Sequence, residues 1–160
     1  MRQCRMTPMA HKTKADRNAY MRRRREQRLA AGLCPFCPNP VDDGRVRCRA
    51  CLDKSNARSA AAVAAARDDL FTRYGGYLCA CCGETERAFL SLDHINRDGA
   101  AHRREMSKGN TNTYPGFRAL HADLKRKGWP PVLQVLCHNC NIGRERNGGV
   151  CPHVTAGVTV

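Results

Sequence analysis

Eight of the eleven cysteines stand in four C-x-x-C pairs, a spacing that is typical of metal ligands. Each pair makes a tight turn that directs two thiolates at one point, and two such turns supply the four ligands of a closed structural zinc site. The first two pairs are separated by only ten residues. The spacing therefore predicts two structural zinc ions, one held by Cys34, Cys37, Cys48 and Cys51 and one by Cys79, Cys82, Cys137 and Cys140.

Cys81 lies inside one of these pairs, in the stretch "CACC". Its position makes it an alternative ligand to Cys79 or to Cys82. The next residue is Gly83, and a turn of this kind often needs a small residue to bring the chain back. This glycine favours Cys82 as the ligand.

Cys4 and Cys151 are expected to be free thiols, and His153 either packs near Cys151 or binds a metal, with packing favoured. A disulfide framework is the competing interpretation of so many cysteines, but it needs an oxidising compartment. The N-terminal stretch is basic and lacks the apolar core of a secretory signal. No run approaches the ~18 apolar residues of a membrane span. We therefore expect a protein of the reducing cytoplasm.

Oxygen and nitrogen side chains stand next to the second cysteine set. The apolar run "FLSL" ends in Asp93 and His94, and Asn141 directly follows Cys140. If one ion joins the cysteines, the two stretches must lie side by side. Carboxylate and amide oxygens suit Mg²⁺ or Mn²⁺, and a histidine with a pKa near 6.5 can accept a proton at neutral pH. A metal ion beside a base suits phosphodiester hydrolysis.

The elements that position these residues follow from periodicity and from turn signals, and they indicate a small α+β protein stapled by zinc. Two amphipathic or alanine-rich segments predict helices, and two apolar runs predict strands. A long insertion between the strands contains Phe117, Leu120 and Leu124 at helical spacing. The predicted elements are a helix over 15–31, a zinc knuckle over 33–52, a helix over 54–74, strands over 89–95 and 132–137, and a short helix over 141–146. The predicted domains are a disordered basic tail (1–14), a helical and knuckle unit (15–68), a second unit (69–153) and a tail (154–160).

The chain is strongly basic, with 28 Lys and Arg against 14 Asp and Glu and a net charge of +14. A basic chain favours a polyanionic partner, and nucleic acid is the expected one. Most of the excess charge lies before residue 69, in the stretch "YMRRRREQR" above all. The side chains expected to contact phosphate are Arg22, Arg23, Arg24, Arg25, His102, Arg103, Arg104, Arg144 and Arg146.

The stretches "YGGYLCACCG", "FLSLDHINRDG", "AHRRE" and "VLQVLCHNCNIGRERNGGVCPH" together resemble the HNH, or ββα-metal, endonuclease family, over roughly residues 70–153. The likeness is to the zinc-stapled members from phages and mobile elements, and it implies double-stranded DNA as the partner. It implies a ββα fold in which Asp93 and Asn141 hold one catalytic Mg²⁺ or Mn²⁺. It also implies that His94 is the general base, in a variant of the motif that ends in asparagine.

The chain departs from that family at one position, because Val132 stands where the middle asparagine of the motif usually lies. That asparagine fixes the loop and orients the base. A backbone carbonyl or another side chain, such as His102 or Asn96, must then do so here. The competing class is a non-catalytic zinc-dependent nucleic-acid-binding protein, and RNA is an alternative target to DNA.

Overall fold

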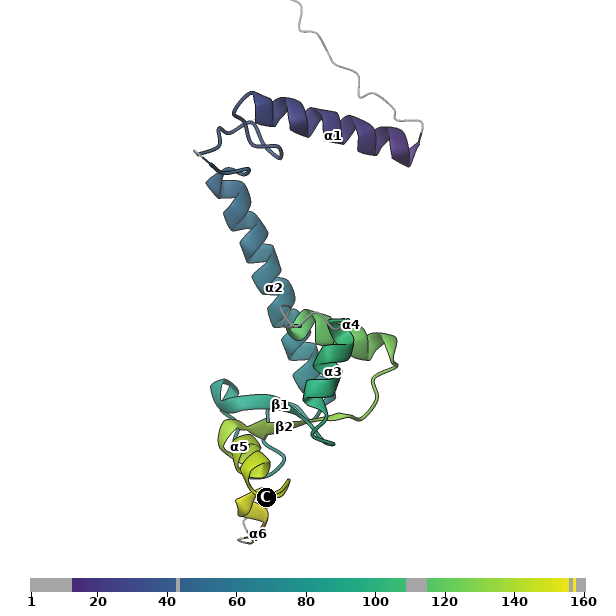
Figure 1. Ribbon diagram of the computed structural model, residues 1–160. Helices are drawn as coiled ribbons and strands as arrows, with labels where there is room; N and C mark the ends of the chain where they lie inside the picture. The colour runs from purple at the N-terminus through teal and green to yellow at the C-terminus, as the bar shows by residue number, and fades with distance from the viewer. Residues whose placement is uncertain (1–12, 43, 109–114, 156, 158–160) are drawn as a thin grey trace, which may run out of the picture. The chain divides into compact units, whose positions relative to one another are not determined.

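The computed structural model describes residues 13–42, 44–108, 115–155 and 157. Its described residues contain six α-helices, one short 3-10 helix and a single two-stranded sheet, so the prediction of a small α+β protein is confirmed (Figure 1). The chain divides into two compact units, Met1–Ser59 and Ala60–Val160. The elements are α1 (Lys14–Ala30), α2 (Arg49–Arg73), η1 (Arg87–Phe89), β1 (Leu90–His94), α3 (Gly99–Met106), α4 (Phe117–Arg126), β2 (Leu133–Cys137), α5 (His138–Arg146) and α6 (Pro152–Thr155).

The first unit begins with α1, which starts where a capping box predicts a start. The Thr13 hydroxyl accepts from the Asp16 backbone N–H at 3.1 Å, and the Asp16 carboxylate accepts from the Thr13 N–H at 3.1 Å. The helix ends before Gly32, whose φ of +67° a residue with a side chain rarely adopts. None of the residues of α1 is buried. Its bounds agree with the predicted helix to within one residue.

The second unit is built on an antiparallel hairpin followed directly by a helix. Strand β1 pairs with β2 in a register that puts Leu90 opposite Cys137 and Asp93 opposite Gln134. Helix α5 begins at His138, the residue after β2. Figure 1 shows the two strands side by side with α5 next to them. Both predicted strands are present, and each is shorter than predicted by one or two residues at its ends.

The last turns of α2 belong to the core of this second unit. Phe71 packs with Val135 and Leu136 of β2, and Leu70 packs with Leu124 of α4. These apolar side chains explain why the units divide at Ser59 and Ala60, inside the helix and before the predicted boundary at residue 69. The connecting helix is thus also a core helix.

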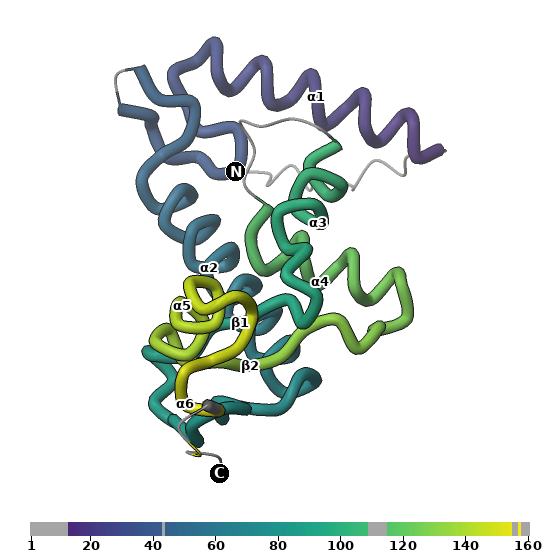
Figure 2. The backbone as a smooth tube through the Cα atoms, turned by 60° about the horizontal axis from the view of Figure 1, so that its bottom comes forward, coloured from purple at the N-terminus to yellow at the C-terminus, as the bar shows by residue number. Residues whose placement is uncertain are grey.

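Two helices of the second unit have no counterpart in the prediction. Helix α3 lies in the segment that the sequence indicates only as an insertion, and it packs on α4. Helix α6 is a single turn that folds back beside α5 (Figure 2). None of the described helices is long and apolar enough to cross a membrane.

Candidate metal centres and histidine relay

The first cysteine set comes together as predicted. The sulfur atoms of Cys34, Cys37, Cys48 and Cys51 all lie within 4.8 Å of one another, and Cys37 Sγ lies 3.3 Å from Cys48 Sγ. Burial opposes ionisation of Cys34, but backbone hydrogen bonds at Cys48 and Phe36 outweigh it and lower its pKa to about 6. A thiolate is the form that binds metal. This group is compatible with a structural zinc ion.

The second cysteine set joins the two ends of the hairpin. Cys79, Cys82, Cys137 and Cys140 form a group of the same kind, and Cys82 Sγ lies 3.7 Å from Cys137 Sγ. Tetrahedral zinc with Zn–S bonds of about 2.3 Å separates neighbouring sulfurs by about 3.8 Å. The backbone N–H of Cys140 donates to Cys137 Sγ at 3.4 Å, so the helix start also holds a ligand. The geometry is compatible with the second predicted structural zinc ion.

The turn at Gly83 determines which cysteine of "CACC" joins this group. Gly83 has a φ of +74°, and its N–H donates to the carbonyl of Cys79 at 3.1 Å. This tight turn places Cys82 with Cys79 in the four-cysteine group. Cys81 points elsewhere and is buried.

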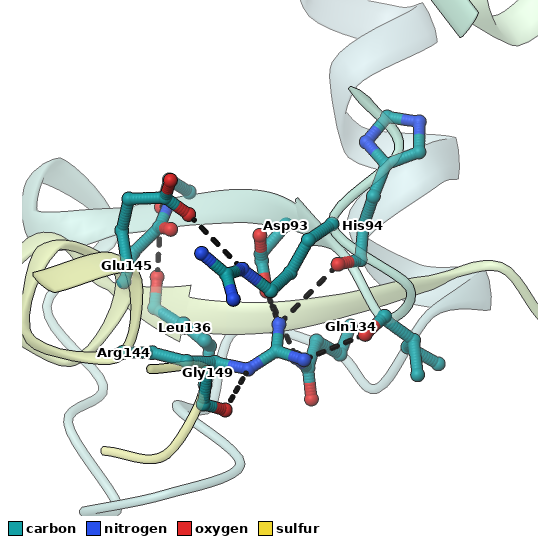
Figure 3. Close-up of polar contacts among 11 residues, drawn as sticks. Asp93, His94, Gln134, Leu136, Arg144, Glu145 and Gly149 are labelled. Carbon is teal, nitrogen blue, oxygen red and sulfur yellow. Dashed lines mark hydrogen bonds and ion pairs between the residues drawn. The ribbon is translucent and has the colours of Figure 1, made fainter. Parts of the chain in front are cut away.

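Asp93 and Asn141 both face the helix α5 side of the hairpin. Asn141 Nδ2 donates to the Ser91 hydroxyl at 3.1 Å, and Asp93 accepts from Gln134 Nε2 at 2.9 Å. Asp93 also forms an ion pair with Arg144. Figure 3 shows Arg144 directed at Asp93, whereas the ring of His94 points away from both. Neighbouring residues of a strand project to opposite faces, which accounts for this separation.

A catalytic divalent ion does not fit this arrangement. The Asp93 carboxylate is only 15% exposed and is already neutralised by the guanidinium of Arg144. A Mg²⁺ or Mn²⁺ ion at Asp93 and Asn141 would first have to displace Arg144.

Arg144 ties the end of β1 to the chain that follows α5. Its guanidinium donates to the carbonyls of His94 at 3.3 Å and Ile95 at 2.6 Å, and Nε donates to the carbonyl of Gly149 at 3.0 Å. With Asp93, this residue therefore has four acceptors inside the protein (Figure 3). The sequence indicates a phosphate contact here, and the structure places the side chain in an internal clamp instead.

His94 belongs to a relay of three side chains on the opposite face of the hairpin. His94 Nε2 lies 2.8 Å from His102 Nδ1, and His102 Nε2 lies 2.9 Å from Asp123 Oδ2. His102 and Asp123 are buried, with relative exposures of 8% and 4%. The sequence indicates His102 either as a phosphate contact or as a residue that orients the base. Because both of its ring nitrogens are engaged, the structure leaves no ring nitrogen for phosphate.

The charge state of Asp123 determines where the protons of the relay lie. Burial opposes its ionisation, but hydrogen bonds from His102 and Lys127 outweigh it and hold its pKa below the usual range. An ionised carboxylate only accepts, so His102 Nε2 carries a proton, and in the neutral form of His102 its Nδ1 accepts from His94 Nε2. The lone pair of neutral His94 is then on Nδ1.

The free nitrogen of His94 faces the start of α3. A Cβ at Gly99 would lie 2.8 Å from His94 Nδ1, so only glycine allows this approach. Burial lowers the pKa of His94 below its usual value. A histidine with a lowered pKa is neutral at pH 7 and can accept a proton.

A main-chain hydrogen bond fixes the loop between the end of β1 and the residue before β2. The N–H of Ile95 donates to the carbonyl of Val132 at 3.0 Å, which ties the end of β1 to the start of β2. His102, from α3, contacts the ring of His94. Both devices are among those that the sequence leaves open for this departure.

His94 lies at the edge of an open cleft of about 470 Å³. Two arginines, Arg67 and Arg103, also line the cleft, together with the apolar side chains Leu92 and Phe117. Cationic groups at the rim suit an anionic ligand. The candidate base, His94, therefore lines the same cleft as two positively charged side chains.

The remaining arginines expected to contact phosphate lie on the surface. Arg103 and Arg104 are exposed on α3, and Arg146 is exposed at the end of α5. In the first unit Arg22, Arg23, Arg24 and Arg25 are exposed on α1.

Sequence reasoning missed Asp123 as a partner in the relay. The signal available was an acidic residue beside Leu124 on the apolar face of a helix, which is an expensive place for an unpaired charge. It did not identify the partner, because His102 lies 21 residues away in the chain.

The chain was also compared with known proteins. No protein-family model, no curated protein and no solved structure matches it.

Proposed function

We propose that the protein is an endonuclease that hydrolyses phosphodiester bonds in DNA, with His94 as the general base. The observation that carries the proposal is the buried Asp123–His102–His94 relay, which ends at the edge of a cleft with arginines on its wall. A buried carboxylate and histidine that support a second histidine fix its ring orientation and its tautomer, as a base requires.

In the proposed reaction a water molecule attacks the phosphorus, and its proton passes to His94 Nδ1. His102 keeps the other nitrogen of that ring protonated and the ring in place. Arg67 and Arg103 supply positive charge beside the phosphate. The bond between phosphorus and the 3′ oxygen breaks, and that oxygen takes a proton from solvent. Resemblance to the ββα-metal family implies these products, a 5′-phosphate and a 3′-hydroxyl.

That resemblance also implies a divalent ion at Asp93 and Asn141. Such an ion would supply Lewis-acid stabilisation of the phosphate charge. It would need Asp93 to give up its ion pair with Arg144, so we assign no step of the reaction to it. The hairpin followed by α5 supports the resemblance through its ββα order alone.

A non-catalytic zinc-dependent nucleic-acid-binding protein is the second candidate. The observation that favours it is the position of Asp93, which pairs with Arg144 on the face away from His94. The net charge of +14 and the two four-cysteine groups suit this candidate equally well.

Nicking of a supercoiled plasmid tests the proposal. The zinc-loaded protein is incubated in low salt with Mg²⁺, with Mn²⁺ or with EDTA, beside His94→Ala and the control His121→Gln. In the control, the amide of the new glutamine can still donate to Asp69, the partner of His121. The Asp123–His102–His94 relay is unchanged. We expect nicking by the wild type and the control, and its loss in His94→Ala. Plasmid binding without nicking in any metal would support the second candidate.

A further inference from the structure

We propose that the second unit binds two zinc ions in one cluster, in which the thiolate of Cys140 bridges both metals. The second ion would be held by Cys81, Cys140, Cys151 and His153. Their ligand atoms all lie within 4.8 Å of one another, as do those of the four-cysteine group that also contains Cys140. This inference does not depend on the proposed function.

The number of ligands fits two tetrahedral ions. The two groups together contain six thiols and one imidazole, which makes seven ligand side chains. Two four-coordinate ions need eight positions, and one bridging thiolate supplies the eighth. Both ions would have four protein ligands and no water ligand, which is typical of a structural site.

The distances and the burial agree with ligation. Cys140 Sγ lies 3.2 Å from His153 Nδ1, near the separation of about 3.6 Å between sulfur and nitrogen ligands of one zinc ion. Cys81 and Cys151 are 8% and 6% exposed, and Cys140 is fully buried. Three thiols packed together in this way, with an imidazole against one of them, form a ready donor set. The sequence indicates a free thiol at Cys151. A free thiol has no need to lie beside two other thiols and an imidazole, as Cys151 does here.

The chain after α5 is built to return to this point. A Cβ at Gly143 would lie 3.1 Å from Pro152, so the glycine permits the close approach of α6 to α5. Gly148 and Gly149 have φ of +64° and +101° and turn the chain back. Arg144 Nε holds the Gly149 carbonyl at 3.0 Å. The "CPH" segment is therefore fixed against Cys140 by packing and hydrogen bonds.

Loading the cluster changes only protons and ligands. Two Zn²⁺ ions displace the protons of six thiols, and His153 binds through Nδ1 as the neutral imidazole. No oxidant is needed. A disulfide between Cys81 and Cys151 is the competing outcome, and it would need an oxidant and would leave His153 without a metal.

Native mass spectrometry of the full-length protein counts the zinc ions. With the knuckle of the first unit loaded, we expect three zinc ions per chain. His153→Ala should lose one ion, and Val154→Ala, at the exposed next residue of α6, should keep all three. His153→Cys should restore the third ion, because a thiolate can take the same position. Two ions in the wild type, or a mass lower by two hydrogens with two ions, would overturn the proposal.

Cadmium substitution tests the bridge in the wild type, without any substitution of a ligand. In ¹¹³Cd NMR of the fully loaded protein, we expect two resonances from all-thiolate sites and one from a site with three thiolates and a nitrogen. The nitrogen site should couple to one of the other two through the Cys140 sulfur. Three resonances without such a coupling would disprove the shared thiolate, and the absence of a nitrogen-containing site would disprove the role of His153.

Discussion

At the scale of single residues, His94 Nε2 faces His102 Nδ1, so with His102 neutral the proton acceptor of His94 is Nδ1. Loss of a general base lowers the rate of a reaction by roughly 10²–10⁴-fold. We therefore expect His94→Ala to reduce plasmid cleavage by about that factor while the affinity for DNA stays the same. Single-turnover cleavage rates and binding isotherms at one salt concentration measure the two quantities separately.

The pH dependence of cleavage follows from the environment of the same residue. Burial lowers the pKa of His94, so its neutral form persists below the usual value of about 6.5. As the pH falls through the lowered pKa, the base becomes protonated and the rate drops. We expect the acid limb of the profile of the single-turnover rate to lie below pH about 6.5 and to vanish in His94→Ala. An acid limb retained in that variant would assign the titration to another group.

Arg144 illustrates how a charged residue near a candidate site can be structural. Its side chain is 18% exposed and joins Asp93 to the carbonyls of His94, Ile95 and Gly149. Lysine keeps the charge but lacks the planar fork that reaches several acceptors. Buried acceptors without a partner cost about 1–3 kcal/mol each. We expect Arg144→Lys to lower the free energy of unfolding by at least about 1 kcal/mol.

Urea denaturation of the zinc-loaded protein measures that change. The urea midpoint should fall in Arg144→Lys. In the exposed control Arg146→Lys the free energy of unfolding should stay within about 0.5 kcal/mol of the wild type. Equal midpoints for the two variants would mean that the four contacts contribute nothing net.

At the scale of elements, the hairpin of β1 and β2 is too small to be stable alone. A two-stranded sheet is marginal in water, and here its apolar residues pack on only a few side chains of α2 and α4. Cys137 ends β2, caps α5 and belongs to the second cysteine group. One ion at this group would therefore hold a strand, a helix and the loop at Cys79 together.

Substitutions in the two cysteine groups should separate the two units. Metal-binding free energy is folding free energy at sites of this kind. We expect Cys37→Ser to lose one zinc ion and to open only Met1–Ser59 to protease, with cleavage activity kept in low salt. Cys137→Ser should lose zinc from the other unit and abolish cleavage. Cleavage by Cys137→Ser would show that the hairpin holds its geometry without the ion.

Elements with a local signal were predictable, and long-range side-chain partners were not. The capping residue Thr13 and the stop at Gly32 bound α1 closely, because both act within one turn. Helix α2 begins at Arg49, earlier than the predicted start at 54, because a cysteine pair conceals a helical turn.

The candidate site divides in the same way. C-x-x-C spacing is local, so each cysteine pair is evident from the sequence, and the four ligands that a closed zinc site needs predict that the pairs join two by two. The relay depends on α3 and α4, whose packing brings Asp123 to His102. Strand alternation, which puts Asp93 and His94 on opposite faces of β1, can also be read from the sequence.

At the scale of the whole molecule, the charge of +14 is distributed over both units, and α1 carries its densest run. Each helical residue turns by about 100°, so four consecutive arginines surround most of the helix and cannot all face one phosphate backbone. Arg24 and Arg25 line a cleft beside Phe36 of the knuckle. Arg22 and Arg23 lie outside that cleft and are exposed.

The salt dependence of DNA binding should show whether Arg22 and Arg23 contact phosphate. Each phosphate contact contributes about 0.9 to the slope of log K against log salt concentration on duplex DNA. We expect the double variant Arg22→Gln, Arg23→Gln to reduce that slope by up to about 1.8. The control Arg118→Gln, Lys125→Gln removes the same charge from exposed positions of α4 and should leave the slope unchanged. Fluorescence anisotropy with a short duplex over a series of salt concentrations gives both slopes. Equal reductions in the two variants would mean that net charge, rather than contact by α1, determines the affinity.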